Sequence, residues 1–230
     1  MKSAVSTSRS APQAARPANG ARIHWLQHPA AKPVLFIGGL LPFCWLFYAA
    51  WADALGANPA EALIRSLGDW TLRFLCLTLA VTPLRQLTGW VALVRFRRML
   101  GLFTYFYVCL HFLAYGWLDK GLDPGDILTD IAKRPFILVG SLGLLLLTPL
   151  ALTSFNRAIR FLGARRWQRL HRLIYPIALL GLLHFFWMRA GKNDFAEVAV
   201  YAVLIGVLLA WRIGRAIKLR RASRAASAGG

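Results

Sequence analysis

Long apolar runs dominate the chain and alternate with short polar connectors. Six of the runs are 18 to 20 residues long. A helix that rises ~1.5 Å per residue needs this length to cross a hydrocarbon core of ~30 Å. Prolines inside the runs are tolerated in membrane bundles, because neighbouring groups satisfy the freed backbone atoms. The pattern predicts an all-α membrane protein, a six-helix transmembrane bundle with helices at residues 34–52, 70–89, 99–118, 135–153, 173–190 and 196–214.

Charged residues divide by sign between the two sides of this predicted bundle. Of the 28 Lys and Arg residues, 21 lie in the two terminal segments or at the second and fourth connectors. All nine Asp and Glu residues lie in or beside the other three connectors. Because basic residues are retained on the cytoplasmic side of a membrane, both the N and C termini are predicted to be cytoplasmic.

Composition agrees with this interpretation of the charge. The formal net charge is +19, yet 57% of the residues are hydrophobic and only 16% are charged. Nucleic-acid-binding domains rarely contain runs long enough to cross a bilayer, so no nucleic-acid partner is expected. We expect membrane lipid around residues 34–214, the transmembrane domain. Residues 1–33 are predicted to be a disordered basic cytoplasmic tail and residues 215–230 a second basic cytoplasmic tail.

Two histidines, His111 and His184, lie well inside apolar runs, where an ionisable group is costly and is a candidate for function. Each lies 11 or 12 residues past the start of its predicted helix, and the two helices run in the same direction. Both side chains are therefore expected at one depth, in the outer half of the membrane. Each histidine could also be a neutral residue hydrogen-bonded within the bundle.

Two neutral imidazoles at one depth suit the two axial positions of a haem iron. A zinc or copper site would usually recruit a third ligand, and only Cys109 lies near that level. Cys44 and Cys76 also lie in apolar runs without paired spacing, so the cysteines are interpreted as packing residues. Aromatic residues flanking the histidines could line a haem slot.

Two further residues are candidate cofactor contacts. His171 stands 13 residues before His184, at the basic start of the fifth predicted helix. It could be a single haem ligand, pair with a haem carboxylate or line a redox-cofactor site, or it could be an interfacial residue. Arg73 lies near the outer end of the second predicted helix and could reach a haem propionate or extend to the interface. We predict that Arg73→Ala lowers haem potential or occupancy.

Three stretches resemble a known family. They are residues 70–86 (WTLRFLCLTLAVTPLRQ), 97–115 (RRMLGLFTYFYVCLHFLAY) and 165–187 (RRWQRLHRLIYPIALLGLLHFFW). They are similar to the MsrQ (YedZ) family, the haem-binding membrane subunits of bacterial protein-methionine-sulfoxide reductase systems, within the ferric-reductase-like transmembrane superfamily. The resemblance covers roughly residues 34–213. Its family pattern matches His111, His171 and His184 as residues associated with haem iron.

The resemblance implies a multi-pass b-type cytochrome of the bacterial cell inner membrane. Such a subunit takes electrons from the quinone pool and passes them to its heterodimer partner, the periplasmic molybdenum-containing reductase MsrP, which repairs oxidised methionines. The chain would then be a non-catalytic electron-transfer subunit of an oxidoreductase complex, without catalytic residues of its own. FMN is implied by the resemblance alone, and no residue is assigned to it.

Two other functions remain open. One is a haem reductase of ferric ion or another small acceptor outside the cell. The other is a transporter in which the membrane-embedded histidines line a proton or substrate path. Related eukaryotic-type reductases carry a long flavin and nicotinamide module, whereas only 16 residues follow Gly214 here. Electrons are therefore expected to enter from a membrane-soluble donor or a separate protein.

Overall fold

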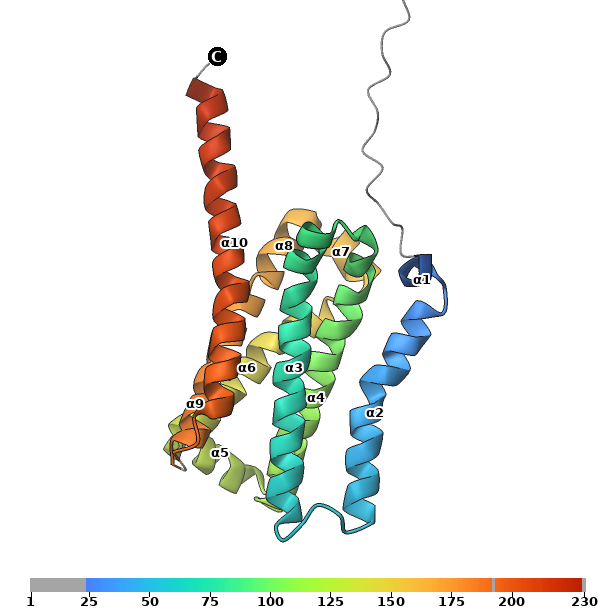
Figure 1. The fold of residues 1–230 in the computed structure, drawn as a ribbon. Coiled ribbons are helices and arrows are strands. Elements are labelled where there is room, and N and C mark those ends of the chain that lie inside the picture. Colours follow the sequence, from blue (N-terminus) through green and yellow to red (C-terminus); the bar gives the residue numbers. More distant parts are fainter. Residues whose placement is uncertain (1–23, 192, 229–230) are drawn as a thin grey trace, which may run out of the picture.

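The computed structural model describes residues 24–191 and 193–228, and every regular element within these ranges is a helix (Figure 1). The predicted all-α fold is confirmed for the described residues. In chain order the elements are α1 (His24–Gln27), α2 (Ala31–Trp51), α3 (Pro59–Thr88), the 3-10 helix η1 (Val91–Phe96), α4 (Arg97–Leu118), α5 (Pro124–Lys133), α6 (Pro135–Leu152), α7 (Asn156–Leu162), α8 (Ala164–His171), α9 (Ile174–Ala190) and α10 (Ala196–Ala228).

Five helical segments among the described residues are long and apolar enough to cross a membrane, which makes the chain a multi-pass membrane protein. They are Ala31–Trp51, Val91–Leu118, Pro135–Leu152, Ala164–Ala190 and Ala196–Ser227. The remaining predicted segment, 70–89, falls in the second part of α3. Charged residues such as Asp69 and Arg73 lower the mean hydropathy of this helix. Five predicted spans thus coincide with candidate spans, and the count of six stays a prediction.

α3 is the helix around which the bundle is assembled. Leu75 on one side of it belongs to a buried cluster shared with α6, α9 and α10. Phe74 on another side belongs to a cluster shared with α2 and α4. The ring of Phe74 stacks on the rings of Phe103 and Tyr107, with a centroid distance of 5.2 Å in each case. Both halves of the hydrophobic core therefore depend on the position of α3.

α2 is attached to this core through a hydroxyl group. The Tyr107 hydroxyl of α4 donates to the Gly39 carbonyl oxygen at 2.8 Å and accepts from the Phe43 backbone N–H at 3.0 Å. Pro42, inside the same turn of α2, has no N–H to donate to the helix. A Cβ on Gly39 would overlap the ring of Phe103, so glycine is what allows α4 to approach. Each of these hydrogen bonds contributes about 0.5–1.5 kcal/mol.

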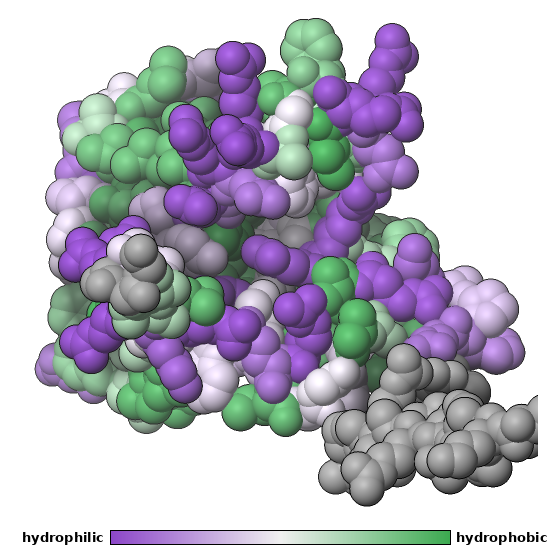
Figure 2. Space-filling view, turned by 90° about the horizontal axis from the view of Figure 1, so that it is seen from above, coloured by the Kyte–Doolittle hydropathy of each residue, from purple (hydrophilic) through white to green (hydrophobic). Residues whose placement is uncertain are grey.

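The helices extend into both predicted terminal tails. α1 and the start of α2 lie before residue 34. Contacts with the bundle hold this segment: Leu26 is buried, and Arg95 donates hydrogen bonds to the Leu26 and Gln27 carbonyl oxygens at 3.0 and 2.9 Å. Residues 1–23 of the first predicted tail lie outside the described residues. In the second, α10 continues to Ala228 through residues that favour helix, and it projects beyond the other helices (Figure 1). Figure 2, which views the molecule from above, shows hydrophilic side chains gathered at this end.

Candidate functional site

His111 and His184, predicted to lie at one depth, are neighbours in the structure. His111 belongs to α4 and His184 to α9. Their ring centroids are 6.0 Å apart and the ring planes are inclined by 82°. Both rings line one cavity of about 360 Å³, which lies between α3, α4, α6 and α9. The bundle therefore brings the two imidazoles together at a cavity wall.

Each imidazole is held by the backbone of a neighbouring helix. His111 Nδ1 lies 2.8 Å from the Ile64 carbonyl oxygen of α3, and His184 Nδ1 lies 2.6 Å from the Phe136 carbonyl oxygen of α6. Because a carbonyl oxygen only accepts, the hydrogen bond requires Nδ1–H in each ring and leaves the lone pair on Nε2 in the neutral form. A metal-binding histidine typically donates its other N–H in this way, which fixes its tautomer and orientation.

Two glycines give the imidazoles their space. Gly68 follows Ile64 by one helical turn, and Gly140 follows Phe136 by one helical turn. A Cβ built on Gly140 would lie 2.7 Å from His184 Nδ1, and one built on Gly68 would lie 3.2 Å from His111 Cε1. The two halves of the site therefore have the same arrangement. In each, a histidine donates to a carbonyl oxygen of a neighbouring helix and packs against the glycine one turn later on that helix.

The cavity combines two imidazole nitrogen donors with a largely apolar lining. The two rings, with centroids 6.0 Å apart, are close enough that both imidazoles could bind one metal ion. The described residues contain no group of three or more His, Cys, Asp and Glu side chains that could hold a metal ion alone. Much of the wall is aliphatic or aromatic, including Leu72, Leu75, Val108, Phe112, Leu144, Leu147, Ile177 and Phe185. This donor set and lining suit haem iron better than a zinc or copper ion.

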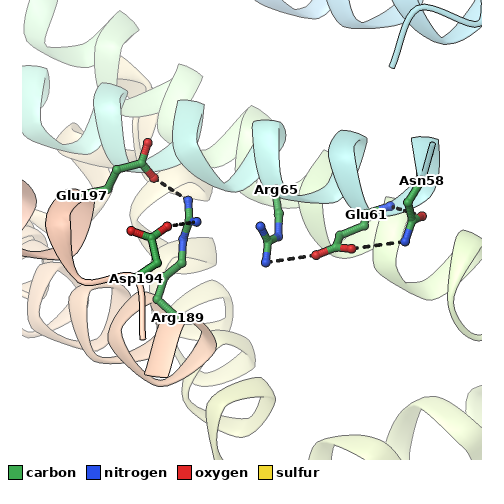
Figure 3. A network of polar contacts seen from close by, with 6 residues as sticks. All are labelled: Asn58, Glu61, Arg65, Arg189, Asp194 and Glu197. Carbon is green, nitrogen blue, oxygen red and sulfur yellow. Dashed lines mark hydrogen bonds and ion pairs between the residues drawn. The ribbon is translucent and has the colours of Figure 1, made fainter. Parts of the chain in front are cut away.

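Polar residues gather where α3 begins, on one wall of the cavity. Arg65 forms an ion pair with Glu61 at 3.0 Å, and both residues line the cavity. Asn58 caps α3 by accepting from the Glu61 backbone N–H at 3.2 Å. Figure 3 also shows Arg189 of α9, which pairs with Asp194, just before α10, and with Glu197 in the first turn of α10. The cavity therefore joins an apolar wall to a wall with a guanidinium group.

A buried carboxylate, Asp130, fixes the connection between α4, α5 and α6. It accepts from the Tyr115 hydroxyl at 2.7 Å and pairs with Lys120 at 3.1 Å and Arg134 at 3.0 Å. Burial acts to raise the pKa of Asp130, but the hydrogen bonds from Tyr115 and Lys120 and the nearby Arg134 guanidinium outweigh it and hold this pKa below its usual range. Since Arg134 and Tyr115 line the cavity, the carboxylate positions part of its wall.

Known proteins are similar to this chain over most of its length. Residues 67–182 match the family described as "Ferric reductase like transmembrane component". Curated proteins named "Protein-methionine-sulfoxide reductase heme-binding subunit MsrQ" are similar over most of the chain. The one from Polaromonas naphthalenivorans is 68% identical over 192 residues, covering 84% of this chain and 88% of the relative. The chain belongs to the MsrQ family.

Other MsrQ relatives are also similar to the chain over most of their length. The protein from Herminiimonas arsenicoxydans is 53% identical over 182 residues, covering 79% of this chain and 84% of the relative. The protein from Bordetella pertussis is 52% identical over 193 residues, covering 84% of this chain and 93% of the relative. No solved structure matches the chain.

In this MsrQ-family chain, the two other predicted site residues lie away from the His111–His184 cavity wall. His171 ends α8, where its ring stacks on Trp167 with a centroid distance of 3.9 Å and its Nδ1 lies 3.1 Å from the Trp167 carbonyl oxygen. Arg73 lies over the ring of Trp70, with its guanidinium carbon 4.6 Å from the ring centroid. Neither residue lines the cavity, so their contacts with a cofactor stay predictions.

Sequence reasoning missed Arg65 and Arg134 as cavity residues. The sequence did contain a signal for them. Arg65 and Arg134 are among the few basic residues in or beside the connectors that hold the acidic residues, so they stand out there. The motif that begins with Asn58 and Pro59 is also a helix start signal, and it places Arg65 on α3 rather than in a connector. The glycines Gly68 and Gly140 were missed because their role depends on which helix faces them.

Proposed function

We propose that this chain is the haem b-binding membrane subunit of a protein-methionine-sulfoxide reductase system. In this proposal it passes electrons from the quinone pool to a periplasmic, molybdenum-containing reductase, MsrP, with which it forms a heterodimer. The observation that carries the proposal is the His111–His184 pair, with both Nδ1 atoms anchored to carbonyl oxygens and both rings on one cavity. The printed name of the MsrQ relatives, a heme-binding subunit, supports it.

The residues of the cavity divide the work of holding the cofactor. Nε2 of His111 and Nε2 of His184 would hold the haem iron, and the Ile64 and Phe136 carbonyl oxygens keep both rings in the tautomer that such binding needs. Arg65 supplies positive charge for a haem carboxylate at the polar wall. When bound there, haem supplies one-electron redox chemistry at a potential set by its ligands and surroundings.

The rest of the chain provides insulation and position rather than catalysis. The largely apolar lining between α3, α4, α6 and α9 would keep water from much of a bound cofactor and lower the local dielectric. We assign no catalytic residue to the chain, since sulfoxide reduction belongs to the partner. FMN remains an implication of the family resemblance, and no residue is assigned to it.

The proposed topology has six membrane crossings in the inner membrane of a bacterium, with both termini in the cytoplasm. α3 is then a crossing helix, although its charged residues dilute its hydropathy. The distribution of charge supports this arrangement, because the acidic residues other than Asp69 lie at or between the helix ends opposite to the basic connectors. The polar wall that contains Glu61 and Arg65 would then face the periplasmic side, where the electron acceptor docks.

A coupled assay tests this function. Membranes that contain the chain are supplied with reduced quinone, the periplasmic reductase and a protein that carries methionine sulfoxide. We expect sulfoxide reduction that requires the chain, is lost with His111→Ala and is retained with His28→Ala, a control that removes an exposed imidazole outside the cavity. Brisk reduction of ferric ion without sulfoxide turnover would favour the metal-reductase alternative. Purified protein without a haem absorbance band, despite adequate haem supply, would reject both redox functions and favour the transporter.

A further inference from the structure

A second cavity lies between α2 and α4, away from the histidine pair. Its volume is about 470 Å³, and it shares no lining residue with the cavity of His111 and His184. Its wall is mainly aromatic and aliphatic, whereas one set of lining residues is basic. We call it the α2–α4 groove, lined by Lys32, Phe36, Leu40, Arg95, Arg98, Met99, Leu102, Phe103 and Phe106.

The groove opens sideways from the bundle. Phe36 and Leu102 are 50% and 40% exposed, whereas Phe103 is 5% exposed and forms the floor. The ring centroids of Phe36 and Phe103 are 5.7 Å apart. Gly39 leaves room for the Phe103 ring against α2, because a Cβ there would overlap that ring. In a membrane this opening faces the acyl chains of lipids rather than water.

The basic residues of the groove lack acidic partners. Arg95 donates to the Leu26 and Gln27 carbonyl oxygens, and Arg98 donates to Asn156 Oδ1 at 2.8 Å, so neutral acceptors hold both guanidinium groups. Lys32 is exposed and makes no hydrogen bond or ion pair with any described residue. No acidic residue occurs between 1 and 52, between 70 and 118 or between 131 and 193. The positive charge at this end is therefore left for an external anion.

An apolar groove with a cationic end matches one class of ligand. We propose that the α2–α4 groove binds an anionic glycerophospholipid, with its phosphate at Lys32, Arg95 and Arg98 and an acyl chain along Phe36, Leu102 and Phe106. Basic pockets between membrane helices typically bind such headgroups. The lipid would add to the attachment of α2 to α4, which consists of the Tyr107 hydrogen bonds and of ring contacts such as Phe36–Phe103. This site is separate from electron transfer and does not depend on it.

Native mass spectrometry of the purified full-length protein tests the proposal. The probes are phosphatidylglycerol and phosphatidylcholine with identical acyl chains, added in titration. We expect preferential retention of phosphatidylglycerol, and Lys32→Gln should weaken its binding about fivefold because one cation near the phosphate is lost. Lys218→Gln, which removes an equal charge from the exposed part of α10, should leave binding unchanged.

A second pair of variants separates charge from structure. Arg98→Gln should also weaken phosphatidylglycerol binding about fivefold, whereas Asn156→Ala, which breaks the same hydrogen bond but keeps the charge, should not. Circular dichroism should show unchanged helix content in all four variants. Equal binding of the two lipids, or equal loss with Lys218→Gln, would overturn the proposal. Glycerol phosphate that binds as tightly as the lipid would also overturn it, because the groove would then recognise phosphate alone.

Discussion

At the scale of single residues, the unusual feature is that two glycines define where two imidazoles can lie. Gly68 and Gly140 each leave open the space over a helix turn whose carbonyl oxygen accepts from a histidine. Glycine in a helix costs roughly 1 kcal/mol relative to alanine. The histidine contacts explain why this cost is tolerated at both positions.

Replacing these glycines should damage the site without harming the helices. Gly140→Ala places a Cβ 2.7 Å from His184 Nδ1, so we expect it to displace the ring and cause a large loss of bound haem. Gly68→Ala, with a nearest ring contact of 3.2 Å, should have a smaller effect. The measurement is haem absorbance per protein. Gly206→Ala on α10 meets nothing within 4 Å, lies outside the cavity lining and is the control. Equal haem content in Gly140→Ala and Gly206→Ala would contradict the assignment.

The histidines themselves give the most direct test of ligation. We expect His111→Ala and His184→Ala each to lose haem, because each removes one of two paired imidazoles. His171→Ala should lose less or should shift a second spectral component. Absorbance and redox titration of the purified variants measure this. Full haem retention in either of the first two variants would disprove the ligand pair.

The depth of the two histidines was predictable from the sequence, whereas their anchoring was not. Counting residues from the start of two parallel helices was enough to place His111 and His184 at one level. The partner carbonyl oxygens and glycines come from α3 and α6, and no periodicity within α4 or α9 specifies which face of those helices is nearby. Arg73 illustrates the same limit, because residue counting predicts only its depth, whereas its contact with the Trp70 ring shows where its guanidinium lies.

At the scale of elements, Asp130 links three helices whose positions shape the cavity. Its partners Tyr115, Lys120 and Arg134 come from α4, the following turn and the start of α6. Phe136, whose carbonyl oxygen holds His184, is only two residues beyond Arg134. Movement of this junction would therefore be transmitted to the His184 ring.

The junction should make stability depend on pH. Because the pKa of Asp130 is lowered in the folded chain, its stabilising effect is complete above the ordinary carboxyl pKa of about 3.9 and is lost as the pH falls through the lowered value. Asp130→Asn should cost roughly 1–3 kcal/mol near neutral pH and remove this acid-dependent component. Thermal unfolding in detergent across a pH series measures both effects. Asp126→Asn, at an exposed position on α5, is the control, and equal destabilisation by the two would refute the role of Asp130.

Helix existence was easier to predict than helix extent. Apolar runs marked the spans, but α3 begins at Pro59 because Asn58 and Pro59 form a helix start, and this signal lies outside the apolar run. α10 continues to Ala228 because helix-favouring residues follow its apolar part. Hydropathy reports where a helix can meet lipid, whereas capping and propensity determine where it begins and ends.

At the scale of the whole molecule, the number of crossings determines which ends share a side. With six crossings, Ala30 and Ser223 lie in the cytoplasm and Ala132 lies outside. With five, Ala30 and Ser223 lie on opposite sides.

All three positions are exposed, so cysteines placed there, in a chain lacking Cys44, Cys76 and Cys109, can be labelled with an impermeant maleimide. We expect labelling of Ala132→Cys in cells with a permeable outer membrane, and of Ala30→Cys and Ser223→Cys only after lysis. Labelling of Ala30→Cys and Ser223→Cys from opposite sides would refute the six-crossing topology.

The central position of α3 has a consequence for how the protein is made. This helix carries Asp69 and Arg73 within its length and falls outside the segments apolar enough to cross alone. Charged residues near the centre of a segment disfavour its release from the translocon into lipid. In the proposed six-crossing topology, we therefore expect α3 to enter the bilayer together with α4, against which it packs most extensively, as a helical hairpin. Insertion of that hairpin would bring the Ile64 carbonyl oxygen to His111 before α6 and α9 are synthesised.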